Sequence, residues 1–328
     1  MIISRTPFRV SFFGGGTDYP IWYKLNKGSV ISVSINKYCF VTLRYLPQFF
    51  DYKYCLRYYK REETKTINEI EHPSIRECLK YLNIEKGIEI VHHADLPAQS
   101  GLGSSSTFTV SMLHALNALT YKMPTKYSLA TDAIKIEQEK IGESVGSQDQ
   151  TAAAFGGLNR IDFGGVRNIN VNPIILEPKT MNNFQNSLAL FFTGFSRSAD
   201  SIAKEQIKLT PKKSKELNSM MDLVNESQKS LINNDINNIG LLLNEQWKLK
   251  KSMSGIITNE KLDYIYKKGI EAGATGGKLL GAGGGGFMLF FVEQDMRENL
   301  RQALKDFLYV PFSFDFSGSQ IIYNSPRV

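Results

Sequence analysis

Cysteine is rare in this chain of 328 residues, and long apolar runs are absent. The three cysteines, at positions 39, 55 and 78, are odd in number and lack the CxxC spacing of zinc sites, so neither a disulfide framework nor a zinc centre is indicated. The longest strongly apolar run, residues 287–292, is far shorter than the ~20 residues that span a bilayer. Arg5, Arg9 and a Gly-Gly-Gly run break the N-terminal apolar stretch, unlike a signal peptide. We expect a cytoplasmic protein with reduced thiols and no membrane partner.

Acidic residues are outnumbered, with 32 against 39 basic residues and a formal net charge of +7. This balance favours anionic partners. The basic residues are nevertheless spread along the chain, and the clusters at residues 211–213 and 248–251 fall in segments with helical periodicity, where a solvated helix face explains them. We therefore expect a small phosphorylated ligand rather than a nucleic acid.

Strands and helices alternate along the chain. Runs rich in β-branched and aromatic residues predict strands at residues 9–13, 28–45, 87–93, 187–193, 287–292 and 320–323. Apolar residues at three- and four-residue spacing predict helices at residues 105–119, 128–141, 198–209, 211–232, 236–253, 259–272 and 294–308. Between them lie a turn-rich stretch at 142–157, a hairpin near 158–166 and a polar, linker-like stretch at 171–186. The pattern indicates an α+β protein of two domains, residues 1–182 and 183–328.

A loop rich in glycine and serine, residues 96–106, joins an expected strand to an expected helix. The first amides of a helix and the positive end of its dipole attract anions. Glycines at 101 and 103 allow an anion close to the backbone, and the serine hydroxyls donate to phosphate oxygens or ligate magnesium. The loop therefore predicts a phosphate site, with an ordinary serine-rich helix cap as the alternative.

The common nucleotide-binding motifs are missing from the sequence. Leu279 follows Gly277-Lys278, where a Walker sequence requires Ser or Thr. Residues 281–286 match GxGxxG, but they precede an expected strand, whereas the dinucleotide motif follows a strand and opens a helix. The HRD and DFG elements of protein kinases are absent too.

Three segments together resemble the GHMP small-molecule kinases. They are residues 6–19, with the run Phe-Arg-Val-Ser-Phe-Phe-Gly-Gly-Gly-Thr-Asp-Tyr, the loop at 96–107, and residues 278–287, with Gly-Ala-Gly-Gly-Gly-Gly. Their order matches that of the family, and they span most of the chain. The resemblance implies a two-domain fold, with an N-terminal ribosomal-protein-like α/β domain and a C-terminal ferredoxin-like α+β domain. Nucleotide and sugar would bind in the cleft between them.

The resemblance also implies a site for ATP and Mg²⁺. ATP would be bound by residues of the central loop: Pro97, Gly101, Leu102, Gly103, Ser104, Ser105 and Ser106. The metal would be held by Ser105 and by Glu137, which stands twelve residues before Asp149. For Glu137 taken alone, a solvated helix face is the alternative.

Catalytic and acceptor-binding residues follow from the same resemblance. Asp149, in Val-Gly-Ser-Gln-Asp-Gln-Thr, would be the base that accepts the hydroxyl proton, with Arg9 beside it; a helix-capping Asp and a surface Arg are the alternatives. The substrate would be bound by residues near the two outer motifs and by one arginine: Gly15, Gly16, Thr17, Asp18, Gly283, Gly284 and Arg197.

Within the family, the segments at 8–20, 145–157 and 192–199 most resemble the kinases of heptose 7-phosphate. This resemblance implies ATP-dependent phosphorylation of the anomeric O1 of D-glycero-D-manno-heptose 7-phosphate to the 1,7-bisphosphate, on a GDP-heptose route to surface polysaccharide, by a monomer or homodimer. Ser147 departs from this group, which has a lysine there. Alternatives are a fucose- or galactose-type kinase, or a non-catalytic sugar sensor or nucleic-acid-binding protein on the same scaffold.

Overall fold

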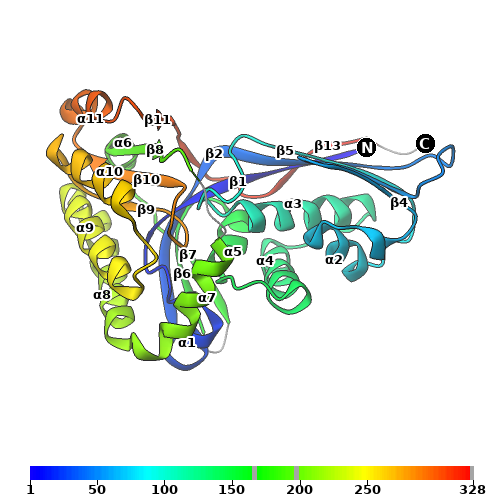
Figure 1. The fold of residues 1–328 in the computed structure, drawn as a ribbon, viewed down its shortest axis with the longest axis horizontal. Helices are drawn as coiled ribbons and strands as arrows, with labels where there is room; N and C mark the ends of the chain where they lie inside the picture. The colour runs from blue at the N-terminus through cyan, green and yellow to red at the C-terminus, as the bar shows by residue number, and fades with distance from the viewer. Residues whose placement is uncertain (165–167, 196–198, 326–328) are drawn as a thin grey trace.

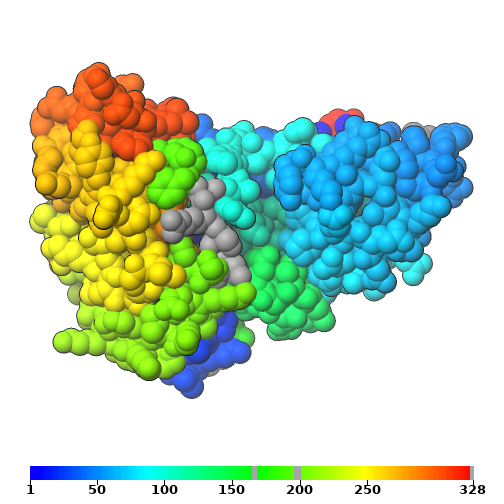
Figure 2. Space-filling model, viewed as in Figure 1, coloured from blue at the N-terminus to red at the C-terminus, as the bar shows by residue number. Residues whose placement is uncertain are grey.

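The structure is a computed structural model that describes residues 1–164, 168–195 and 199–325. The molecule is elongated, with a large sheet and its helices at one end and a smaller sheet with its own helices at the other (Figure 1). The space-filling view shows the same two lobes, blue to green on one side and yellow to orange on the other (Figure 2). This arrangement confirms the expected α+β, two-domain architecture.

The larger sheet is built around two long antiparallel strands, β1 (Ile2–Phe13) and β2 (Gly28–Tyr45). The first half of β2 pairs with β6, and its second half pairs with β5, so one strand joins two parts of the sheet. The remaining members are β3 (Tyr54–Arg57), β4 (Arg61–Thr64), β5 (Ile88–Ala94), β6 (Leu158–Phe163), β7 (Ile169–Pro173), β12 (Phe314–Asp315) and β13 (Gln320–Asn324). Because β12 pairs with β2 and β13 with β1, late residues of the chain complete the first sheet.

Helices cover one face of this sheet (Figure 1). The central one, α3 (Ser104–Leu119), packs on β1 and β2 and is buried along most of its length. Thr125 caps the helix α4 (Lys126–Lys135) by accepting a hydrogen bond from the Ser128 amide. Around α3 lie α2 (Pro73–Tyr81), α4, α5 (Gln148–Phe155) and two short turns, the 3₁₀ turn η1 (Ile67–Glu69) and the π-helical turn η2 (Ile136–Ile141). The helix α1 (Pro20–Asn26) lies apart from them, at the lower end of the view in Figure 1.

The smaller sheet has the order β11-β8-β10-β9 and is antiparallel throughout. Every residue of its central strand β10 is buried. The helix α9 lies directly on β9, because a Cβ added to Gly276 would fall 1.9 Å from the Gly240 carbonyl oxygen. The elements of this lobe are α6 (Pro178–Asn186), β8 (Leu188–Phe192), α7 (Ala199–Leu209), η3 (Thr210–Lys212), α8 (Ser214–Ile232), α9 (Ile236–Met253), α10 (Glu260–Glu271), β9 (Ala274–Leu279), β10 (Phe287–Val292), η4 (Gln294–Met296), α11 (Arg297–Ala303) and β11 (Leu308–Tyr309).

The two lobes meet at the loops that carry the outer and central motifs. The Lys278 ammonium, on β9, donates to the carbonyl oxygens of Ser11 at 2.9 Å and Phe12 at 2.8 Å, at the end of β1. A Cβ on Gly101 would fall 2.4 Å from the Leu280 carbonyl oxygen, so the two glycine-rich loops touch through their backbones. Only glycine allows this approach, and the contact forms one wall of the pocket described below.

Some expected elements differ from those observed. The linker expected at residues 171–186 contains the end of β7 and the helix α6, which begins at Pro178 and buries Phe184. Proline at the first position of a helix is favourable, so Pro178 opens a helix here and does not mark a linker. The turn-rich stretch at 142–157 contains α5, whose alanines are buried. The expected domain boundary at residue 182 falls within α6, and the division there stays a prediction. No helix of the described residues is long and apolar enough to cross a membrane.

Candidate active site

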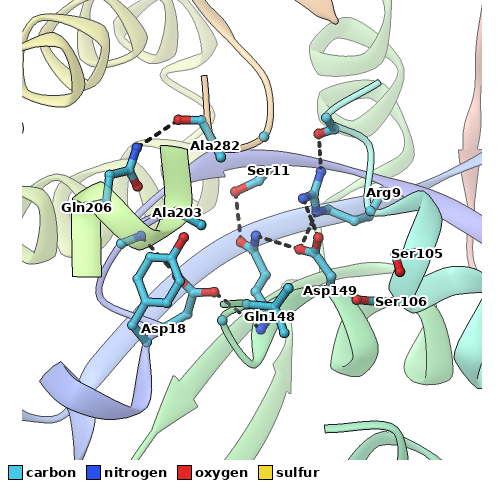
Figure 3. Close-up of a pocket in the computed structure, with 18 of the residues that line it drawn as sticks. Arg9, Ser11, Asp18, Ser105, Ser106, Gln148, Asp149, Ala203, Gln206 and Ala282 are labelled. Atoms are coloured by element: carbon cyan, nitrogen blue, oxygen red, sulfur yellow. Dashed lines mark hydrogen bonds and ion pairs between the residues drawn. The ribbon is translucent and has the colours of Figure 1, made fainter. Parts of the chain in front are cut away.

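A pocket of about 190 Å³ lies where the two lobes meet (Figure 3). Its walls come from four parts of the chain: the end of β1 and the turn after it, the loop before α3, the segment before α5, and residues of the smaller lobe. Those that carry chemistry are Arg9, Ser11, Asp18, Ser104, Ser105, Ser106, Gln148, Asp149, Gln206, Lys250 and Lys278. The pocket thus gathers residues from all three motifs.

The loop before α3 presents free backbone amides to this pocket. Gly103, at φ +80°, precedes the helix in the left-handed conformation, and no side chain caps the helix. The first helical hydrogen bond runs from the Thr107 amide to the Gly103 carbonyl, so the three serine amides before it have no helical partner. Among the described residues, the buried Oγ atoms of Ser100 and Thr107 also lack a partner. This donor-rich helix terminus fits a phosphate group.

Arg9 and Asp149 form a bidentate ion pair at the pocket wall (Figure 3). Nε and Nη2 of Arg9 each donate at 2.8 Å to one carboxylate oxygen of Asp149, and Nη1 donates at 2.7 Å to the Gly101 carbonyl oxygen. Arg9 is only 4% exposed, whereas Asp149 is 27% exposed and faces the pocket. A Cβ on Gly103 would lie 3.2 Å from Asp149 Oδ2. The pair is therefore in direct contact with the loop at the start of α3.

Asp18 lies on a second wall of the pocket and is buried. Its carboxylate accepts from the Gly16 amide at 2.9 Å and from the Gln148 amide at 3.4 Å. Burial raises the pKa of Asp18, and the nearby Asp149 carboxylate raises it further. Of the neighbouring residues expected to bind substrate, Gly15 and Gly16 line the pocket. Thr17 is fully buried and closes the turn by donating to the Gly14 and Ser29 carbonyl oxygens.

Glu137 lies in the π-helical turn η2 and has no exposed surface, so a solvated helix face is the wrong interpretation. Its Oε2 accepts from Ser106 Oγ at 2.7 Å and from Gln150, while its buried Oε1 has no partner among the described residues. Burial raises the pKa of Glu137 to about 7. Ser105, the other expected metal ligand, lines the pocket, but it is Ser106 that contacts Glu137. A carboxylate and hydroxyl oxygens with one unsatisfied acceptor fit a magnesium ion.

Two buried lysines of the pocket were not among the expected site residues. Lys278 is 2% exposed, and Lys250, on α9, is 8% exposed and donates to the Gly281 carbonyl oxygen. The expectation that the 248–251 cluster is a solvated face is therefore wrong for Lys250. A signal was present, because Leu243, Trp247 and Lys250 share one buried helix face at four- and three-residue spacing.

The other expected site residues occupy varied places. Pro97 is exposed, and Leu102 belongs to the apolar core. Gly281 and Ala282 line the pocket, whereas Gly283 and Gly284 contact Ile257, to which the Gly284 amide donates at 2.8 Å. Gln206 of α7 fixes this loop by donating to the Ala282 carbonyl oxygen at 2.7 Å (Figure 3). Arg197 lies outside the described residues.

Comparison with known proteins supports the expected family for both halves of the chain. Residues 69–157 match the family profile described as GHMP kinases N terminal domain, and residues 227–310 match GHMP kinases C terminal. The chain is 32% identical to D-glycero-alpha-D-manno-heptose 7-phosphate kinase of Campylobacter jejuni, over 97% of each protein. It is 28% identical to a galactokinase of Pyrococcus furiosus, over 92% of each.

Solved structures agree with this assignment of the fold. A D-glycero-D-manno-heptose 1-phosphate kinase from Bacteroides thetaiotaomicron matches with a TM-score of 0.78 at 24% identity, covering 99% of this chain and 100% of that one. A putative sugar kinase from Campylobacter jejuni matches with a TM-score of 0.75 at 29% identity, covering 98% of both.

Proposed function

Since the chain belongs to the GHMP kinase family and is a sugar-phosphate kinase, we propose that it transfers the γ-phosphoryl group of ATP to the anomeric O1 of D-glycero-D-manno-heptose 7-phosphate. The product would be the 1,7-bisphosphate, made in the cytoplasm by a monomer or homodimer for a GDP-heptose route to surface polysaccharide. The observation that carries the reaction type is the Arg9–Asp149 pair in contact with the loop before α3. The heptose acceptor rests on the 32% identity over 97% of both chains.

The loop before α3 would hold the phosphates of ATP. Amides of Ser104, Ser105 and Ser106 point out of the helix terminus without helical partners, and they would donate to phosphate oxygens. Ser105 or Ser106 together with Glu137 would hold Mg²⁺, which, when bound, neutralises charge on the phosphate oxygens. Glu137 brings an oxygen that no described donor satisfies, which supports this assignment.

Asp149 would accept the proton of the acceptor hydroxyl. Its Oδ1 accepts from Arg9 Nε and from Gln148 Nε2, at 3.3 Å. Its Oδ2 accepts from Arg9 Nη2 and from no other donor among the described residues, so it retains a lone pair for that proton. As the bond between O1 and the γ-phosphorus forms, the bond from this phosphorus to the bridging oxygen breaks, and ADP leaves with that electron pair. Proton transfer comes late in such a loose transition state, so positioning by Arg9 matters more than a high pKa.

Asp18 would bind the acceptor's other hydroxyl groups. A carboxylate can accept hydrogen bonds from two hydroxyls. The amides of Gly16 and Gln148, both in the pocket wall, fix the orientation of the Asp18 carboxylate. The glycines at 15 and 16 leave room for a sugar next to the backbone.

Release of ADP in the presence of D-glycero-D-manno-heptose 7-phosphate tests the proposal. We expect turnover by the parent protein and a loss of several orders of magnitude in Asp149→Asn. Asp162→Asn is the matched control, because Asp162 also accepts from an arginine, Arg160, at 2.8 Å but does not line the pocket. Equal turnover in Asp149→Asn would remove Asp149 as the base.

A sugar panel tests the choice of acceptor. The competing acceptors are D-galactose, because one relative is named a galactokinase, and L-fucose, the other sugar that the sequence leaves open. Preferential phosphorylation of either one over heptose 7-phosphate would overturn the heptose assignment while leaving the kinase chemistry in place. A protein that binds sugar but releases no ADP with any acceptor would instead be a non-catalytic sensor.

A further inference from the structure

Lys250 is the one charged side chain that the helix α9 sends into the pocket, among the described residues. It is 8% exposed, and its Nζ donates to the carbonyl oxygen of Gly281. An ammonium has three N–H donors, and no second acceptor for Lys250 is found among the described residues. Two donors are therefore available to a ligand in the pocket.

Lys250 is tied to the contact between the two glycine-rich loops. Gly281, which it holds, lies against Gly101, since a Cβ on Gly281 would fall 2.4 Å from the Gly101 Cα. Arg9 donates to the Gly101 carbonyl oxygen at 2.7 Å. Two cations, one from each lobe, therefore reach the same loop contact, next to the loop proposed to hold the nucleotide phosphates.

The charges around this point favour an anion. Three basic side chains, Arg9, Lys250 and Lys278, line the pocket together with two carboxylates, Asp18 and Asp149. Burial lowers the pKa of Lys278 well below its ordinary value. Lys278 already donates to two carbonyl oxygens, and Arg9 donates to Asp149 and the Gly101 carbonyl.

Of the three cations, Lys250 has the fewest protein acceptors. Burial and the nearby Arg9 guanidinium together lower the pKa of Lys250 to about 8, against the opposing effect of the Asp18 and Asp149 carboxylates. A phosphate beside Lys250 would supply the acceptor oxygens and the negative charge that its ammonium lacks.

We propose that Lys250 is a further catalytic residue, whose ammonium binds the oxygens of the phosphoryl group during transfer. This assignment rests on the proposed kinase function. A phosphate in the pocket has two sources, the terminal phosphate of ATP and the phosphate of the acceptor. The position of Lys250 beside the contact of Gly281 with Gly101 assigns it to the terminal phosphate of ATP.

Calorimetric titration of Lys250→Met tests the assignment without turnover. The ligands are ADP, the β,γ-imido analogue of ATP and heptose 7-phosphate. Loss of a charge-assisted hydrogen bond predicts an affinity for the imido analogue that is lower by about 10- to 100-fold, with the affinities for ADP and heptose 7-phosphate within about twofold of the parent. In turnover assays, kcat should fall by about 100-fold and be partly restored in Lys250→Arg.

Lys248→Met is the matched control, since Lys248 lies on the same helix, is exposed and pairs with Glu245. Equal loss of affinity for ADP and for the imido analogue would mean that Lys250 only supports the loop at Gly281, and it would overturn the proposal. Loss confined to heptose 7-phosphate would place Lys250 on the acceptor phosphate and overturn it as well. If the parent fails to phosphorylate heptose 7-phosphate but the contrast between the two nucleotides holds, only the proposed acceptor is refuted.

Discussion

Gly146 sets the position of Asp18, and replacing it with alanine tests the acceptor site. A Cβ on Gly146 would fall 1.9 Å from Asp18 Oδ2 and 2.6 Å from Cγ, far inside van der Waals contact. The backbone angle φ of Gly146 is not in the left-handed region, so alanine adds a clash without backbone strain. The change in Gly146→Ala is therefore directed at one carboxylate.

The magnitude follows from the bonds that hold Asp18. To make room, the carboxylate must leave the amides of Gly16 and Gln148, which costs about 1–3 kcal/mol for buried partners left unsatisfied. We expect a fall in Tm of a few degrees, on the order of 2–6 °C for a chain of this size. The acceptor loses its oriented carboxylate, so KM for the sugar phosphate should rise by about 10- to 100-fold.

Steady-state kinetics with varied acceptor, together with titration of the β,γ-imido analogue of ATP, measures both sites. The nucleotide affinity should stay within about twofold of the parent, because Asp18 is assigned to the acceptor alone. Gly255→Ala is the control, since a Cβ there meets nothing within 4 Å. An unchanged acceptor KM in Gly146→Ala, with a crystal structure showing Asp18 displaced, would refute the role of Asp18.

Four further predictions concern charge and packing. Burial raises the pKa of Glu137 from 4.5 to about 7. The protonated carboxyl therefore contributes stability that is fully present below pH 4.5 and is lost as the pH rises through 7. Without metal, the Tm of the parent should fall over this range relative to that of Glu137→Gln, which has no charge to bury. At pH 8, Mg²⁺ should raise the Tm of the parent and not of Glu137→Gln; an equal rise in both would remove Glu137 as a ligand. The pKa of Lys250 is lowered to about 8, and only its ammonium form binds phosphate, so kcat/KM should fall as the pH rises through about 8. In Lys250→Arg this fall should move to higher pH, and a pH profile identical to that of the parent would contradict the assignment. Gly269→Ala places a Cβ 2.2 Å from the Phe290 ring, and this overpacking should lower the free energy of unfolding by about 1–3 kcal/mol, as measured by thermal unfolding. A Tm equal to that of Gly255→Ala would contradict the packing of α10 on the smaller sheet.

Elements with strong local patterns were predictable from the sequence. The strand at 28–45, the helix at 236–253 and the strand at 287–292 have the bounds that the sequence predicts, because each is a distinct periodic or continuous apolar segment. The helix at 294–308 was overestimated, since α11 ends at Ala303. Boundaries of this kind depend on tertiary contacts that periodicity does not contain.

The site was predictable only where the residue types themselves carry the chemistry. The loop before α3 could be interpreted from its glycines and serines. Arg9 and Asp149 lie 140 residues apart in the chain, so their pairing came from the family resemblance and not from spacing. The contact of Glu137 with Ser106 and the burial of Lys278 depend on how distant segments meet, and no local pattern encodes that. The burial of Lys250 was predictable in principle, from its helical spacing with Leu243 and Trp247.

The strand β13 pairs with β1 on the side opposite β2, so the last strand of the sheet to be synthesised covers an edge of an early one. The strand β1 is synthesised long before β13; it has β2 on one side, but its other edge stays open until residues 320–324 emerge. An open edge strand is a template for pairing with other chains. A fragment that stops at residue 182 would expose this edge permanently, so we expect it to aggregate, and the complete sheet to form only after translation of the second lobe.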